Sequence, residues 1–192
     1  AETMVERVTG GRSLPPEVMA QILAKTDGVP LFVEEFTRNV LESGLLIEDG
    51  ARYRLDGPLP PFAIPSTLQD SLMARLDRMA TVKEIAQIGA AIGREFSFAV
   101  LGAVVGRDDA ALHAALEQLE QAELLYRSAP PPDLRYSFRH ALVQDAAYES
   151  LLKSRRQQLH QRIARVLEDR FPAIAEAEPE ILAHHFSRAG LA

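Results

Sequence analysis

Two basic residues, Arg139 and His140, stand where a strand-like run gives way to an apolar helix in the stretch FRHALVQDAAYESLL. The first turn of a helix carries free backbone N–H groups and the positive end of the helix dipole, and anions bind there. An imidazole N–H in this position is a short-range donor to a phosphate oxygen. The pattern therefore predicts an anion contact. It is equally typical of polar residues that occupy a first helical turn for structural reasons alone.

A second stretch, GVPLFVEEF, places Gly28 and Pro30 at a tight junction between two helices. Glycine is favoured just after a helix ends, because it adopts the left-handed conformation without strain. Proline is favoured in the first turn of the next helix, where its missing N–H would have had no partner. Local chemistry alone predicts an ordinary helix-to-helix turn at this junction.

The sequence carries none of the common motifs for catalysis. It has no G-x-x-x-x-G-K-[ST] phosphate loop, no G-x-S-x-G nucleophile turn and no H-E-x-x-H zinc motif. The segment TGGRS near the start is too short and too poorly placed to cradle phosphates. We therefore predict no catalytic residue and no bound metal for this chain by itself.

Five histidines raise the question of a metal site. His184 and His185 are adjacent, and neighbouring side chains on a helix point about 100° apart, so the pair is not expected to share one ion. Neither has a carboxylate four residues further along. We predict exposed or partly buried polar residues here, and the sequence reveals no partner for His113 or His160.

The composition indicates a folded protein with a core. The chain has 192 residues, of which 47% are hydrophobic and 25% charged, enough for one large or two small domains. The absence of cysteine excludes disulfides and thiolate metal sites and fits a cytoplasmic location. A net charge of −6 gives no general attraction to nucleic acid or to an anionic membrane. No apolar run approaches the ~20 residues that a membrane span needs. We therefore expect the chain to bind neither nucleic acid nor a membrane.

The first part of the chain predicts two helices and a hairpin. Helices begin near Pro16 and Pro30, each with apolar residues three and four apart, and the run LLIEDGARYRL indicates a hairpin around Asp49 and Gly50. The stretch DGPLPPFAIP has four prolines in ten residues and predicts an extended linker.

Helices resume after this linker. Ser66 with Gln69 forms a capping box, and Thr81 is positioned to cap the next helix. A short buried helix, or a strand, follows in EFSFAVLGAVVG, and Asp108 begins another helix. Two strand-like pieces, LLYRS and LRYSFR, flank a proline-rich turn. Three helices followed by a hairpin are the layout of a winged helix, after which the chain is helical again.

A winged helix suggests DNA binding, but the charges oppose it. The helix before the wing, residues 108–123, carries five acidic residues and no lysine or arginine. Basic side chains supply much of the affinity for phosphates in DNA, so this helix would be repelled. The basic segment KSRRQQLHQRIARV predicts a solvated face or a docking face for an acidic neighbour.

Taken together, the two stretches resemble motifs of signal-transduction ATPases with numerous domains (STAND ATPases). GVPLFVEE resembles the G-x-P-L motif that ends their helical lid. FRHALVQDAAYESLL resembles the stretch after their winged helix, which reads Met-His-Asp-Leu-Val in several relatives. The phrases IPSTLQDSLMARLDRM and AAIGREFSF resemble the ATPase region found in bacterial class III adenylate or guanylate cyclases and in large regulators with tetratricopeptide repeats. The likeness extends over nearly the whole chain from Pro16.

The resemblance implies roles for four residues. Pro30, with Gly28 of the same motif, would pack against the adenine of bound nucleotide. His140 would reach the β-phosphate of ADP and hold the closed, inactive state. Arg139 stands where relatives have Met and would add a phosphate contact or point to solvent. Ala141 stands where relatives have Asp, so the bracing carboxylate is absent.

The resemblance also implies a domain organisation. Residues 1–44 would end a helical lid, 45–65 would form the hairpin and linker, 66–152 the winged-helix domain, and 153–192 the start of an α-helical superhelix. ATP or ADP would bind only together with a nucleotide-binding core preceding residue 1, and the ends AETMVERVTGGRS and SRAGLA are those expected of a fragment.

The predicted function is therefore regulatory and not catalytic. The chain would close over nucleotide held by the upstream core and couple its state to an output domain such as a nucleotide cyclase. Its partners would be the upstream core, downstream helical repeats and other proteins. The alternatives are a winged-helix DNA-binding regulator and a helical protein-interaction scaffold.

Overall fold

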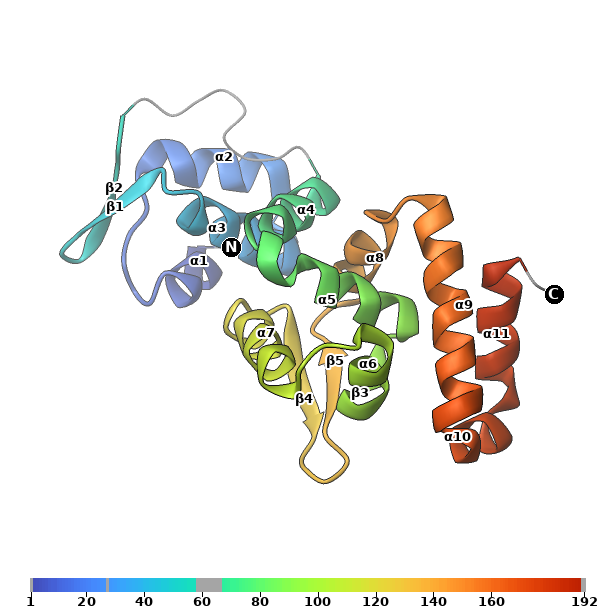
Figure 1. The fold of residues 1–192 in the computed structure, drawn as a ribbon. Helices are drawn as coiled ribbons and strands as arrows, with labels where there is room; N and C mark the ends of the chain where they lie inside the picture. Colours follow the sequence, from blue (N-terminus) through green and yellow to red (C-terminus); the bar gives the residue numbers. More distant parts are fainter. Residues whose placement is uncertain (1, 27, 58–66, 191–192) are drawn as a thin grey trace. The chain divides into compact units, whose positions relative to one another are not determined.

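The protein is mainly helical and contains two small antiparallel sheets (Figure 1), which confirms the predicted fold class. The computed structural model describes residues 2–26, 28–57 and 67–190. The chain forms two compact units, residues 1–78 and 79–192, and each is described by itself. The first unit includes the helix at 68–78, which the sequence had grouped with the residues that follow it.

The first unit packs its helices around a small apolar core. Its elements are α1 (Glu2–Val8), α2 (Pro16–Thr26), α3 (Pro30–Glu42), β1 (Leu46–Asp49), β2 (Arg52–Leu55) and α4 (Leu68–Arg78). The predicted apolar stripes face this core: Val18 and Ile22 from α2 pack with Val33, Phe36 and Val40 from α3. Strands β1 and β2 pair in an antiparallel hairpin, as the sequence predicts.

Helix α4 is held to α3 by a buried charged network as well as by apolar contacts. Arg75 is only 1% exposed, and its guanidinium pairs with Glu35, which is also buried. Its Nε and Nη2 atoms donate to the two carboxylate oxygens of Glu42 at 3.1 Å. Burial acts to lower the pKa of Arg75, but the charges of Glu35 and Glu42 outweigh it and raise that pKa. Asn39 adds a hydrogen bond of 3.0 Å to the backbone carbonyl of Ser71.

The second unit contains the predicted order of helices and strands. It comprises α5 (Ala80–Ile92), β3 (Glu95–Ser97), α6 (Phe98–Val105), α7 (Asp109–Gln121), β4 (Leu125–Ala129), β5 (Arg135–Phe138), α8 (Ala141–Glu149), α9 (Lys153–Arg170), α10 (Pro172–Ala177) and α11 (Pro179–Ala189). The sheet has the order β3-β5-β4 and is antiparallel throughout. Three helices and a strand precede a hairpin in this unit, and its assignment as a winged helix stays a prediction.

Helix α5 packs unusually close to strand β3. A Cβ atom added at Gly89 would lie 2.8 Å from the ring of Phe96, so only glycine allows this approach. Phe96 is buried and stacks with Tyr136 of β5 at a centroid distance of 6.2 Å. Small residues therefore let α5 lie directly against the aromatic layer of the sheet.

Helix starts differ in detail from the sequence prediction. Ser66 lies outside the described residues, and in the structure the hydroxyl of Thr67 accepts the backbone N–H of Asp70 at 3.0 Å. Thr81 lies inside α5, whose N-cap is Met79, so the prediction that Thr81 caps this helix is wrong. Asp108 caps α7 as predicted, and its carboxylate accepts from the N–H groups of Ala110 and Ala111.

Helices α9 and α11 lie side by side at the end of the second unit (Figure 1), with the short helix α10 between them in sequence. Their contact surface includes His160 of α9 and His185 of α11, both buried. No helix in the described ranges is both long enough and apolar enough to cross a membrane.

The Arg75 network predicts a large effect for one substitution. Arg75→Met removes the partner of the buried Glu35 carboxylate, which is then left without a compensating charge. We expect a loss of about 3–5 kcal/mol in the free energy of unfolding, the usual cost of breaking a buried pair. Urea unfolding followed by circular dichroism measures this loss.

Two further variants test that explanation. Arg78→Met removes the nearby pair with Glu42, whose side chains are 35% and 39% exposed, and should cost less than about 1 kcal/mol. The double variant Glu35→Leu and Arg75→Met removes both buried charges and should recover part of the loss. Equal destabilisation by Arg75→Met and Arg78→Met would contradict the assignment.

Candidate functional site

Gly28 and Pro30 form the turn between α2 and α3. Gly28 has φ +72°, in the left-handed region that favours glycine. Nothing lies within 4 Å of a Cβ placed on it, so a larger side chain would be opposed by the backbone conformation and not by a steric clash. Pro30 is the first residue of α3 and is exposed. Val29 between them is 43% exposed. The turn has the predicted geometry and presents an open apolar surface.

His140 is the N-cap residue of α8. Its backbone is extended, with φ −135° and ψ 148°, and its carbonyl accepts the N–H of Val143 at 3.0 Å. Its imidazole is half-buried and makes no capping hydrogen bond. The side chain therefore stands at the start of a helix without capping it, and among the residues that the structure describes its ring nitrogens have no hydrogen-bond partner.

Arg139 is less available than the sequence suggested. Its guanidinium lies 3.1 Å from the carboxylate of Glu123, and the side chains are 42% and 33% exposed. Glu123 has φ +54° in the turn after α7, so this partner is placed by an unusual backbone conformation. A phosphate at Arg139 would have to compete with that carboxylate.

The four residues fall into two pairs in different units. Gly28 and Pro30 belong to residues 1–78, whereas Arg139 and His140 belong to residues 79–192. Within each pair the residues are neighbours along the chain, and the structure brings no further predicted residue to either. The predicted nucleotide contact would need one pair from each unit, and it stays a prediction.

Helix α8 is fixed to α5 by a polar contact one turn after His140. The side-chain amide of Gln144 donates to the backbone carbonyl of Ala90 at 3.2 Å, near the end of α5. The next residue, Asp145, is exposed and lines a hollow of about 210 Å³ together with Tyr148, His184 and Arg188. The Gln144 bond sets the position of α8 and with it the position of His140.

A chain of partly to fully buried hydrogen bonds borders this hollow, and the sequence did not predict it. The hydroxyl of Tyr148 is 2.9 Å from Nε2 of His160, and Nδ1 of His160 is 2.8 Å from Nδ1 of His185. His160 and His185 are 2% and 1% exposed, so the prediction that the His184–His185 pair is at most partly buried is wrong for His185. His184 is exposed as predicted.

The chain of bonds is suited to neutral imidazoles. With both rings neutral, one Nδ1 donates and the other accepts, whereas two protonated rings would place two donors face to face. Burial, followed by His184 and Arg188, lowers the pKa of His160 to about 4. Burial, followed by His160 and His184, lowers the pKa of His185 to about 4. Among the described residues no group of three or more His, Asp or Glu side chains is arranged to hold a metal ion.

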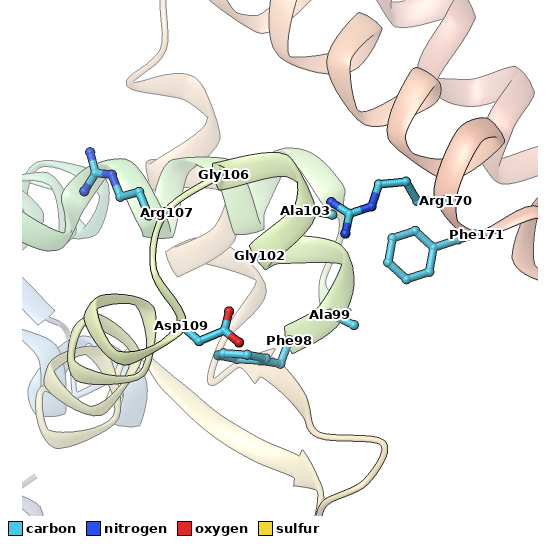
Figure 2. Close-up of a pocket in the computed structure, with 9 residues that line it drawn as sticks. All are labelled: Phe98, Ala99, Gly102, Ala103, Gly106, Arg107, Asp109, Arg170 and Phe171. Carbon is cyan, nitrogen blue, oxygen red and sulfur yellow. The ribbon is translucent and has the colours of Figure 1, made fainter.

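A larger hollow of about 590 Å³ lies beside α6 (Figure 2). Its floor is the small-residue face of α6, with Phe98 and Asp109 on one side and Arg170 and Phe171 from the end of α9 on the other. The ring of Phe98 also stacks on His113 at a centroid distance of 4.2 Å. The lining offers apolar contacts and isolated charges, with no nucleophile placed beside a base.

A comparison with curated proteins finds a similar protein whose name states no function. The chain is 29% identical over 180 residues to "Uncharacterized protein R02095" of Rhizobium meliloti (strain 1021). The match covers 93% of this chain and 17% of that protein. No family model and no solved structure matches the chain. This chain is thus similar to a segment about one sixth the length of a longer protein.

The buried histidines predict a loss of stability in acid. Their pKa is near 6.5 in the unfolded chain and about 4 in the folded one, so the unfolded state takes up protons first as the pH falls. Stability is full above pH ~6.5 and falls as the pH drops toward 4. Between pH 7 and pH 5 we expect a loss on the order of 2 kcal/mol for each histidine.

Urea unfolding at pH 7 and pH 5 measures this loss. His185→Gln should reduce the difference between the two pH values, because one titrating group is gone. His113→Gln is the matched control: it removes an exposed histidine of the same unit and should leave the difference unchanged. An equal pH dependence in all three proteins would show that other groups cause it.

Proposed function

We propose that this chain is a regulatory, non-catalytic part of a STAND-type ATPase. In this proposal a nucleotide-binding core elsewhere in the protein holds ATP or ADP. The turn at Gly28 and Pro30 packs on adenine, and His140 reaches the β-phosphate. The nucleotide state then controls an output domain such as a nucleotide cyclase, in a protein located in the cytoplasm.

The observation that carries this proposal is the geometry of His140. The residue stands at the N-cap of a nine-residue helix, and its side chain is not used for capping. The helix has no acidic residue in its first turn, so nothing there opposes an incoming phosphate through the helix dipole. An imidazole in that place can add a directional hydrogen bond to the attraction of the helix start.

The turn before α3 supports the same proposal. Pro30 and Val29 are exposed on a turn whose shape is fixed by Gly28 and by the ring of Pro30 itself. A rigid apolar surface of this kind loses little conformational entropy when a flat ring packs on it. The contact therefore suits an adenine base, and it needs no charged residue.

DNA binding is disfavoured by the charges around the predicted recognition helix. Glu117 and Glu120 lie on α7, which has no lysine or arginine. Arg127 on the neighbouring strand pairs with Glu120 at 3.0 Å, so this arginine is already neutralised. A mobility-shift assay at low salt with tight, sequence-dependent binding would reverse this conclusion.

The test of the proposal is ADP affinity in the full-length protein. His140→Ala removes the donor to the β-phosphate while keeping the backbone of the N-cap. We expect the dissociation constant for ADP to rise about tenfold or more, since a hydrogen bond to a charged group contributes about 1.5–3 kcal/mol. Isothermal titration calorimetry with ADP measures the change.

His113→Ala is the control, because it removes an exposed histidine of the same unit that the proposal does not use. It should leave ADP affinity unchanged. ADP affinity that is the same in the His140→Ala variant and the unmodified protein would refute the role of His140. Failure of the full-length protein to bind any adenine nucleotide would refute the proposed function as a whole.

A further inference from the structure

Two arginines pair with a single carboxylate beside α5 and α9, and a third arginine lines the same hollow. Glu84 of α5 accepts from Nη2 of Arg107 at 2.6 Å, and its other oxygen lies 3.5 Å from Nη2 of Arg155. Arg162 lies two turns further along α9 than Arg155, and its Nη2 is 3.4 Å from where a Cβ on Gly106 would stand. The three guanidinium groups thus come from a loop and from two positions on one helix that are two turns apart.

The three arginines line one small hollow. Its volume is about 120 Å³, and its floor includes Ile88 of α5 and Leu159 of α9, both buried. Gln158 adds an amide at the wall. Arg107 also lines the hollow beside α6, and Figure 2 shows its guanidinium directed away from Asp109, in keeping with its pairing to Glu84.

The charges in this hollow do not balance. Arg107, Arg155 and Arg162 contribute three positive charges and Glu84 one negative charge, which leaves a net charge of +2. No ion pair to Arg162 occurs among the residues that the structure describes. The protein as a whole has a net charge of −6, so this local excess is opposite in sign to the average surface.

The start of α9 adds to the positive potential. Its first turn contains Lys153 and Arg155 and no acidic residue, and its N-cap, Leu152, makes no side-chain cap. Basic residues at a helix N-terminus are unfavourable, because they meet the positive end of the dipole. The chain thus keeps an arrangement that costs stability, and bound negative charge would offset that cost.

We propose that this hollow binds the doubly charged phosphate group of a small molecule, held by Arg107, Arg155 and Arg162. Guanidinium groups recognise phosphate oxygens through paired, charge-assisted hydrogen bonds. A phosphate monoester carries close to two negative charges at neutral pH, which matches the net +2 of the cluster, whereas a single carboxylate would leave one charge uncompensated. Glu84 occupies part of the site when phosphate is absent and holds two of the arginines in place.

This proposal uses none of Gly28, Pro30, Arg139 and His140. Its outcome is therefore independent of the proposed ATPase role, and either can fail without the other. The variants below alter exposed side chains, so the fold should be retained, and a thermal unfolding scan of each variant checks this.

The probe is inorganic phosphate, titrated into the chain at low salt and followed by NMR signals of the arginine Nε–H groups. We expect saturable binding with shifts at Arg107, Arg155 and Arg162. Arg162→Gln should raise the dissociation constant about tenfold, as expected for one charge-assisted contact. Arg165→Gln is the matched control: it makes the same charge change three residues away, outside the hollow, and should alter the constant less than twofold.

A third variant acts in the opposite direction. Glu84→Gln removes the competing carboxylate and should strengthen phosphate binding several-fold. Acetate, with one negative charge, should bind at least tenfold more weakly than phosphate. A phosphate monoester that binds more tightly than inorganic phosphate assigns the site to an organic phosphate, and equal affinities assign it to free phosphate.

Three results would overturn the proposal. One is the absence of saturable binding at millimolar phosphate. Another is equal weakening by Arg162→Gln and Arg165→Gln, which would indicate nonspecific attraction to a basic surface. The last is unchanged or weaker binding by Glu84→Gln, because the proposed site requires phosphate and this carboxylate to compete.

Discussion

The close packing of α5 against its neighbours is the constraint on which the second unit depends. Gly89 allows the helix to touch Phe96, and the carbonyl of Ala90 receives the amide of Gln144. The first contact fixes α5 on the sheet, and the second fixes α8 on α5. Glu84, two turns earlier on the same helix, faces the arginines of α9 and the loop after α6. One helix therefore positions both His140, through α8, and the arginine cluster.

Periodicity in the sequence predicted the helices and the hairpins, because burial of an apolar stripe is a local pattern. It could not predict which polar residues share that burial. Arg75 lies between the apolar positions Leu72 and Leu76 of α4, and only the approach of Glu35 from α3 allows it to be buried. His160 and His185 are 25 residues apart, and their bond depends on the pairing of α9 with α11. The chemical position of His140 was predictable because a helix start is a local feature.

The two buried polar networks stabilise their units by different means. The Arg75 network is charged, and its guanidinium stays protonated at any ordinary pH because Glu35 and Glu42 raise its pKa further. The network of His160 and His185 is neutral, and its stability depends on neither ring taking up a second proton to become an imidazolium. Mild acid should therefore act on the α9–α11 pair and leave the contact of α3 with α4 intact. The two units therefore differ in how their stability responds to mild acid.

The arginines near the β4–β5 hairpin differ from those on α9 in how many acidic partners they have. Arg127 pairs with Glu120, Arg135 with Glu95 and Arg139 with Glu123, so these three arginines near the hairpin each have an acidic partner. Such pairs add little stability at the surface, but they cancel the field that a nucleic acid would require. Beside α5 and α9, one glutamate pairs with two arginines, and a third arginine lines the same hollow. An added anion is therefore attracted more strongly to the arginines beside α9 than to those near the hairpin. Near the hairpin, protein carboxylates already neutralise the arginines.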